Sequence, residues 1–539
     1  MKKVHILLIC SMICLMLTLL PIRSHAAVEP DNAGQFGDLQ WKLEDNCLTI
    51  TGEGYMPSAE DVPAPWGDGW DEDVQKITRV VIGEGVKNIR ESCFSRFHGL
   101  QEIQLPEGLE RIGSYAFYEC WNLKTIALPD SLTHIGHSAF YDCIALESIT
   151  IPAAVTEIDS NAFYGCTALR TVTLAEGLVT LGSGVFYNCA LLQQIQLPGT
   201  LHSMGARVFA YCASLESITI CNGVTSIPLE AFVNCIRLTQ VNLPGTVTTI
   251  ETAAFSSCEA LQQIWLPDSL TLLENHAFAG CIRLESIRVP SSLTQIPYSA
   301  FAGCSNLKTV ELHNNVTHIG PYAFYHCQSL AAIRIPASLQ TIEDQAFEGC
   351  GGLQKVEAED LAAWLQIQFY SASANPLSQG GYLFLNGKQT TQLILPEGFT
   401  AVNPYAFTGY QHLKSVYFPD GMVNIGHDAF SHCVRLESLH LPKTMSIIGS
   451  NAFAGCDQLQ TVVFDGAPTL LQYMQVADGN EPLAQAQVTL SQEAMEKAGL
   501  GVANALVRAS LWIIGGMLVI GGIVVVIIVI YRKRNPYRL

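Results

Sequence analysis

The hydrophobic positions of the chain recur with a single period over most of its length. A phenylalanine returns every 23 residues, and in most cases a cysteine follows it three residues later. A fixed period in this range indicates a repeat architecture. The phenylalanines are Phe94, Phe117, Phe140, Phe163, Phe186, Phe209, Phe232, Phe255, Phe278, Phe301, Phe324 and Phe347, then, after an interruption, Phe407, Phe430 and Phe453.

Each repeat contains two short apolar segments. The first alternates apolar and polar residues, which predicts a short strand, and a proline usually ends it. The second is a pair of apolar residues before a glycine turn. A unit this small cannot bury its own apolar side, so the fifteen units (twelve plus three) are expected to stack into a mainly β solenoid. One unit reads Leu123-x-x-Ile126-x-Leu128-Pro129-x-x-Leu132-x-x-Ile135-Gly136-x-x-Ala139-Phe140-x-x-Cys143.

This motif, L-x-x-I-x-L-P-x-x-L-x-x-I-G-x-x-A-F-x-x-C, resembles the BspA-like leucine-rich repeats of bacterial and some protozoan surface proteins. The resemblance covers roughly residues 77–464. It implies a leucine-rich-repeat solenoid and a function in attachment to matrix proteins, glycans, other microbes or cell surfaces. The ligands of such proteins differ widely, so the resemblance implies a class of function and no particular ligand.

The repeat pattern also divides the chain into segments. Residues 77–357 hold twelve repeat units, and residues 391–466 hold three more. Residues 27–76 look like the small β module that often precedes such repeats, which would cap the first unit and cover a sheet edge. Residues 358–390 are expected to form an inserted helix and hairpin, and residues 467–510 a stalk.

Both ends of the chain indicate export and anchoring. Residues 1–26 have the charged start, apolar run and small-x-small site of a secretory signal, with an uncleaved N-terminal anchor as the alternative. Residues 511–530 are long and apolar enough to cross a bilayer as a helix. Arg532, Lys533 and Arg534 lie near the start of the short tail, residues 531–539, and predict that the tail is cytoplasmic and that the repeats lie outside. The family resemblance implies that this outside is a bacterial cell surface.

The composition narrows the possible partners. The formal net charge of −19 argues against nucleic acid, because phosphate binding needs a basic surface. The sequence has no helix-spaced His-Glu-x-x-His pair, no Gly-x-Ser-x-Gly and no glycine-rich phosphate loop. We therefore expect no cofactor, no metal site and no enzymatic activity.

The regularly spaced cysteines allow two interpretations. In an exported protein, cysteines usually form disulfides, and neighbouring units would bring these within reach. The same position, however, also accepts Phe97 and Tyr410, which is the behaviour of a packing position. We favour buried free thiols that act as small hydrophobic groups, with a few disulfides as the alternative. The expected structural core includes Phe117, Cys120, Phe140, Cys143, Phe163 and Cys166.

One outward-facing column on the first strands changes character along the solenoid. Its first half is small and neutral, and from Trp265 onward it becomes aromatic and charged. An exposed Trp beside Arg is a common anchor of binding surfaces. The alternative is that Trp265 only covers its neighbours and that the charged residues form a solvated cross-strand ladder with Glu357. The candidate binding residues are Trp265, Arg288, Glu311 and Arg334.

Three functional hypotheses follow. The first is an adhesin-like, membrane-anchored protein that binds an extracellular protein or glycan ligand. The second is a passive scaffold, or an envelope protein that associates with itself. The third is a receptor ectodomain that signals through a partner membrane protein, since residues 531–539 are too few for a signalling domain.

Overall fold

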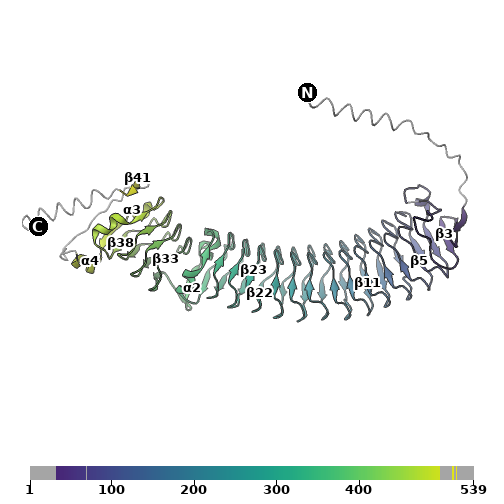
Figure 1. The fold of residues 1–539 in the computed structure, drawn as a ribbon, viewed down its shortest axis with the longest axis horizontal. Coiled ribbons are helices and arrows are strands. Elements are labelled where there is room, and N and C mark those ends of the chain that lie inside the picture. Colours follow the sequence, from purple (N-terminus) through teal and green to yellow (C-terminus); the bar gives the residue numbers. More distant parts are fainter. Residues whose placement is uncertain (1–31, 68, 498–512, 515–516, 519–539) are drawn as a thin grey trace, which may run out of the picture.

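The computed structural model describes residues 32–67, 69–497, 513–514 and 517–518. The repeats stack into an elongated, gently curved rod, with the N-terminal strands at one end and α4 at the other (Figure 1). Two ladders of short strands run along the rod, because every unit contributes one strand to each. Paired residues of successive units are mostly 23 positions apart, as in Thr171↔Gln194, and the paired strands within each ladder are parallel.

The first ladder contains the alternating strands of the repeat, with their central residue buried and its neighbours mostly exposed. Its strands are β4 (Arg79–Ile82), β6 (Glu102–Gln104), β8 (Thr125–Ile126), β10 (Ser148–Ile151), β12 (Thr171–Leu174), β14 (Gln194–Ile195), β16 (Ser217–Thr219), β18 (Gln240–Asn242), β20 (Gln263–Ile264), β22 (Ser286–Arg288), β24 (Thr309–Glu311), β26 (Ala332–Ile335), β28 (Lys355–Ala358), β30 (Tyr382–Leu385), β32 (Gln392–Ile394), β34 (Ser415–Tyr417), β36 (Ser438–Leu441), β38 (Thr461–Phe464) and β40 (Gln487–Leu490).

The second ladder is formed by the second apolar pair of each unit, and its strands are mostly two residues long. They are β5 (Asn88–Ile89), β7 (Arg111–Ile112), β9 (His134–Ile135), β11 (Glu157–Ile158), β13 (Thr180–Leu181), β15 (Ser203–Met204), β17 (Ser226–Ile227), β19 (Thr249–Ile250), β21 (Leu272–Leu273), β23 (Gln295–Ile296), β25 (His318–Ile319), β27 (Thr341–Ile342), β29 (Gln368–Phe369), β33 (Ala401–Val402), β35 (Asn424–Ile425), β37 (Ile447–Ile448) and β39 (Gln475–Val476).

The core between the ladders consists of columns of like residues. The phenylalanine rings from Phe94 to Phe347 stack with centroids 5.1–5.7 Å apart and nearly parallel planes. Offset stacking of this kind contributes beyond simple burial. The six residues expected in the structural core are all fully buried: Phe117, Cys120, Phe140, Cys143, Phe163 and Cys166.

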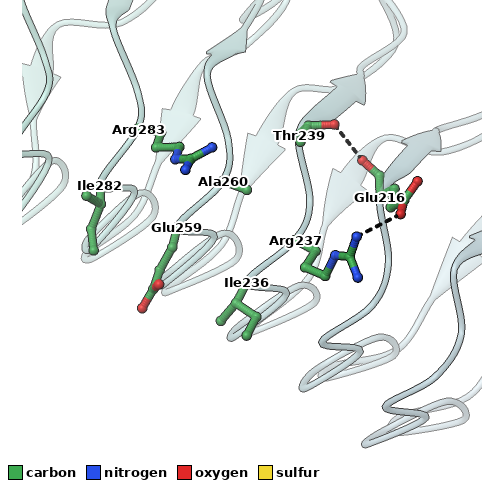
Figure 2. A pocket seen from close by; sticks show the side chains of 8 residues that line it. All are labelled: Glu216, Ile236, Arg237, Thr239, Glu259, Ala260, Ile282 and Arg283. Carbon is green, nitrogen blue, oxygen red and sulfur yellow. Dashed lines mark hydrogen bonds and ion pairs between the residues drawn. The ribbon is translucent and has the colours of Figure 1, made fainter.

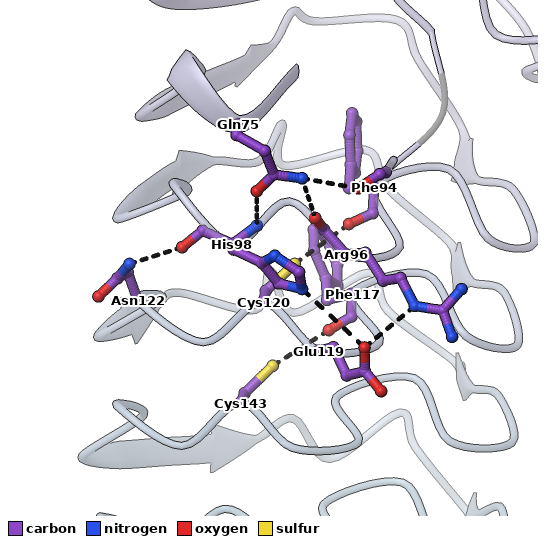
Figure 3. Close-up of polar contacts among 10 residues, drawn as sticks. Gln75, Phe94, Arg96, His98, Phe117, Glu119, Cys120, Asn122 and Cys143 are labelled. Carbon is purple, nitrogen blue, oxygen red and sulfur yellow. Dashed lines mark hydrogen bonds and ion pairs between the residues drawn. The ribbon is translucent and has the colours of Figure 1, made fainter. Parts of the chain in front are cut away.

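The column of cysteines joins successive units through sulfur. The Cys120 thiol donates a hydrogen bond to the carbonyl of Phe94 at 3.1 Å, and Cys143 donates to Phe117 at 3.2 Å (Figure 3). The same bond recurs at the other cysteines of the column. All sixteen described cysteines are free thiols. The column therefore acts as packing with a weak hydrogen bond, which agrees with the favoured interpretation.

The turn around each phenylalanine uses left-handed backbone conformations. In one unit these lie two residues either side of Phe140, at Ser138 (φ 52°) and Asp142 (φ 53°). The N–H groups of all three residues donate to carbonyls of the next unit, at 2.7–3.0 Å. This third line of hydrogen bonds between units satisfies backbone groups that the two ladders leave free.

A small antiparallel sheet covers the N-terminal end of the first ladder. Its strands are β1 (Ala33–Phe36), β2 (Leu39–Glu44) and β3 (Cys47–Thr51), and β3 pairs with β4 in parallel. A 3-10 helix, η1 (Val74–Lys76), follows. The Trp66 ring stacks on Phe94 at 6.1 Å and so closes the phenylalanine column. The strands of this sheet occupy the edge that β4 would otherwise expose.

The repeat is interrupted between β28 and β32. This segment forms α2 (Leu361–Gln366), the 3-10 helices η2 (Ala372–Ala374) and η3 (Pro376–Gln379), and a hairpin of β30 with β31 (Lys388–Gln389). The buried Trp364 lies 6.4 Å from the Phe407 ring and donates its indole N–H to Ala406 at 2.9 Å. The Asn375 side chain donates to the same carbonyl at 2.8 Å. These two side chains fix the last three repeat units to the insertion.

The C-terminal end differs from the expected stalk. Residues 467–497 contain η4 (Pro468–Tyr473), β39, α3 (Glu481–Gln485), β40 and α4 (Gln492–Lys497). β39 pairs with β37, and β40 with β38, so both ladders gain another turn. The expectation of a stalk here is wrong up to residue 497, because apolar residues such as Val488 pack on the core without repeating the 23-residue pattern. The expected stalk residues 498–510 lie outside the described residues.

Most of the two predicted membrane-directed segments also lies outside the described residues. This applies to residues 1–26 and to all of 511–530 except four residues, which form β41 (Ile513–Ile514) and β42 (Met517–Leu518), paired antiparallel. Across the described part of the chain, no helix has the length and apolar character needed to span a bilayer.

Candidate binding surface

Trp265 is a large apolar side chain that the solenoid leaves in solvent. It directly follows β20 in the outward-facing column of the first ladder, and its side chain is 74% exposed. No described residue stacks on its ring or places a cation over it. Most of the surface of this side chain is therefore open to solvent. The indole is available for contact with another molecule.

The charged residues of the same column do not form the cross-strand ladder considered above. Arg288 and Glu311 are register partners, but the Arg288 guanidinium pairs with Asp268 at 3.2 Å. Arg334 similarly pairs with Glu359 at 3.2 Å. Both cations lean toward acidic residues outside the column, in exposed pairs that contribute little to stability. The structure thus leaves Arg288, Glu311 and Arg334 exposed at the surface, and Arg288 does not cover Trp265.

A groove lies on the loop side of the same units (Figure 2). Its volume is about 440 Å³. Ala260 lies in its middle, and its short side chain leaves a hollow between the longer side chains of the units before and after it. The repeat period alone does not predict this groove, whose signal in the sequence is a small residue between two arginines at the same repeat position. The lining residues are Glu216, Ile236, Arg237, Thr239, Glu259, Ala260, Ile282 and Arg283.

The groove combines apolar and charged groups. The Ile236 and Ile282 side chains are 42% and 40% exposed at its border. Arg237 pairs with Glu216 at 3.3 Å, and the Glu216 carbonyl accepts a bond from Thr239 at 2.9 Å. Within the described part of the molecule, Arg283 forms no ion pair. One guanidinium is thus held by its neighbour, whereas the other is free for a ligand.

The groove and Trp265 belong to the same part of the solenoid. Ala260 and Trp265 lie in one repeat unit, five residues apart, and the arginines and isoleucines come from the units on either side. We call the groove-lining residues together with Trp265 and Arg288 the central surface. It offers one aromatic face, two exposed aliphatic side chains and an unpaired guanidinium. This set of groups suits binding.

The described residues do not form a metal site. No group of three or more histidine, cysteine, aspartate or glutamate side chains among them could hold an ion. The buried thiols are also poor nucleophiles, because burial raises the pKa of Cys212 and Cys304 to about 12.

Two parallel ladders, stacked columns and a regular turn define the class of leucine-rich-repeat solenoid proteins. The chain matches the BspA type Leucine rich repeat region over residues 72–152, 133–262, 249–374 and 379–475. Because these matches cover most of the sequence, the chain belongs to this family.

Solved structures of other proteins align with most of the chain. A leucine-rich repeat protein from Bacteroides ovatus aligns with a TM-score of 0.50 at 21% identity, over 85% of this chain and 100% of that one. A leucine rich cell surface protein from Faecalibacterium prausnitzii aligns at 22% identity with a TM-score of 0.32, over 82% and 97% of the two chains. The pneumococcal vaccine antigen PcpA aligns at 17% identity with a TM-score of 0.24, over 85% and 98%. No curated protein sequence matched the chain.

Proposed function

We propose that this protein is an adhesin-like binding protein of the bacterial cell surface that recognises an extracellular protein or glycan through its central surface. The observation that carries the proposal is Trp265, which is 74% exposed and has no ring or cation partner among the described residues. An exposed indole offers a large apolar face that a ligand can cover. Tryptophan and arginine are also the residues most enriched among binding hot spots.

The location is part of the same proposal and rests on the sequence. A signal-like start at residues 1–26 would direct export, and residues 511–530 would anchor the chain by a single membrane span. The basic residues after that segment would keep the tail inside and the repeats outside. The rod would then carry the central surface away from the membrane.

The proposal is tested by measuring the binding of the purified full-length chain to arrayed glycans and immobilised extracellular matrix proteins. We expect saturable binding to a ligand and an at least tenfold weaker affinity for Trp265→Ala, which corresponds to about 1.4 kcal/mol. Trp70→Ala is the matched control, because Trp70 is 73% exposed, precedes the first repeat unit and does not belong to the central surface.

Three outcomes would contradict the proposal in different ways. Binding that Trp265→Ala leaves unchanged would remove the central surface as the site. A loss of binding in both variants would indicate a general effect of removing tryptophan. The absence of any ligand, together with concentration-dependent self-association, would favour the scaffold hypothesis instead.

A further inference from the structure

The interruption of the repeat leaves one strand of the first ladder without a partner on one side. β32 is the first strand of its sheet, and among the described strands it pairs with β34 alone. The strand that precedes it in the chain, β31, pairs instead with β30 in a hairpin. Figure 1 shows this interruption between α2 and β33.

The hydrogen bonds of β32 show which of its backbone groups are free. The Leu395 N–H donates to Tyr417 at 2.9 Å, and the Thr391 carbonyl accepts from Lys414 at 2.7 Å. Alternate residues of a strand turn their polar groups to opposite sides. Gln392 and Ile394 therefore turn their N–H and C=O groups away from β34, toward the side that has no strand.

The side chains beside this edge are apolar. Ile394 is 74% exposed and Tyr417, its register partner on β34, is 40% exposed. The other strands of the first ladder carry mostly polar or charged residues at this position, such as Asn242 and Glu311. An open edge with exposed apolar residues is a site at which another strand can add.

We propose that the edge of β32 binds an extended peptide segment of a partner protein, which adds as a strand beside Gln392–Ile394. Alternating N–H and C=O groups are matched by the backbone of another strand, so the partner is a polypeptide. Its side chain next to Ile394 is apolar. Only Thr390 and Thr391 separate the hairpin from β32, so the hairpin stays close to this edge and limits the space beside it. A single strand therefore fits this position better than the sheet of a second solenoid.

The probe is a fluorescent synthetic peptide with the sequence of residues 329–337, which contains β26, a strand of the same ladder. We expect saturable binding to the full-length chain by fluorescence anisotropy, and slower hydrogen exchange of the Gln392 and Ile394 amides in the complex. Replacing Ile333 of the peptide by proline should abolish both effects, because proline removes an N–H and disturbs the strand.

The decisive variant is Ile394→Pro. It removes an outward N–H but no bond to β34, so the fold should survive, and peptide affinity should fall at least tenfold. Ile394→Val is the control and should bind the peptide normally. If Ile394→Pro misfolds, Ile394→Asp replaces it as the variant expected to lose peptide affinity. Trp265→Ala should bind the peptide normally, which separates this site from the proposed function.

Four results would overturn the inference. They are no peptide binding by the native chain at millimolar concentration, equal binding by Ile394→Pro, amides of Gln392 and Ile394 already protected in the free chain, and self-association lost in Ile394→Pro. The third would mean that another segment of this chain covers the edge. The fourth, seen by sedimentation velocity, would mean that a second copy does.

Discussion

At the scale of single residues, the repeat is held by positions that serve backbone hydrogen bonding as well as packing. Each register cysteine fills a small space behind a phenylalanine and donates its S–H to a carbonyl 26 residues earlier. The left-handed positions around the phenylalanine accept residues as different as Arg207 and Ala253. A residue other than glycine destabilises the fold by about 1 kcal/mol when its backbone is left-handed, so the hydrogen bonds between units must outweigh that strain.

The cysteines give a first prediction. At pH 8, a maleimide reagent should modify the half-buried Cys47 and Cys221 and leave the register cysteines from Cys120 to Cys456 unmodified. The thiolate is the reactive form, and burial raises the pKa of the register thiols from Cys120 to Cys433, to about 12 at Cys350. Mass spectrometry of the labelled chain identifies the modified residues.

The same raised pKa values determine whether the stability of the fold increases or decreases with pH. An unfolded thiol ionises near about pH 8.5, whereas the folded thiols stay protonated to a much higher pH. The resulting stabilisation is complete below about pH 8.5 and decreases as the pH rises toward 12. Labelling of the register cysteines at pH 8 without unfolding would show that they are accessible and would contradict this account.

At the scale of elements, two buried asparagines complete the stack where a regular unit is missing. The Phe430 N–H donates to the carbonyl of Ala452 in the next unit. Phe453 has no such unit, and its N–H donates to the Asn480 side chain at 2.9 Å. At the insertion, the Asn375 side chain acts as the donor instead, and together with the Trp364 indole it donates to the Ala406 carbonyl. A side-chain amide thus replaces the backbone of an absent repeat.

Asn480→Ala should therefore destabilise the C-terminal end. The change leaves the buried Phe453 N–H and the carbonyls of Gly449 and Ala477 without this partner, at a cost of about 1–3 kcal/mol. Urea denaturation and hydrogen exchange of residues 447–490 measure the loss. The matched control is Asn314→Ala, an exposed turn residue whose removal should change stability by less than about 0.5 kcal/mol.

An Asn480→Ala variant as stable as the native chain, with unchanged exchange near Phe453, would contradict this role. Because each repeat contacts mainly its neighbours, the effect should also stay local. Faster exchange in the distant unit around Phe140 would therefore be unexpected.

At the scale of the whole molecule, the periodic part of the fold could be predicted and the aperiodic part could not. The spacing of Phe117 and Phe140 by 23 residues was enough to predict the stacked units and the buried columns. The groove depends on the short side chain of Ala260 among longer neighbours, which no period reveals. The last turn was missed because Val488 and Asn480 reproduce the contacts of a repeat without its sequence.

The candidate site was predictable only in part, for a related reason. Alternation along β20 places Trp265 on the outside, and the structure leaves it exposed. The direction of a long charged side chain is not fixed by alternation, because Arg288 can reach either Glu311 or Asp268. It reaches Asp268, at 3.2 Å.

The central claim, that the solenoid binds its ligand through the central surface, is tested most directly by hydroxyl-radical footprinting. The rate of side-chain oxidation is measured for the full-length chain with and without the ligand found on the arrays. We predict that oxidation of Trp265 falls severalfold in the complex while that of Trp70, the internal control at 73% exposure, stays the same. Unchanged oxidation of Trp265 at saturating ligand would contradict the claim and place binding elsewhere on the rod.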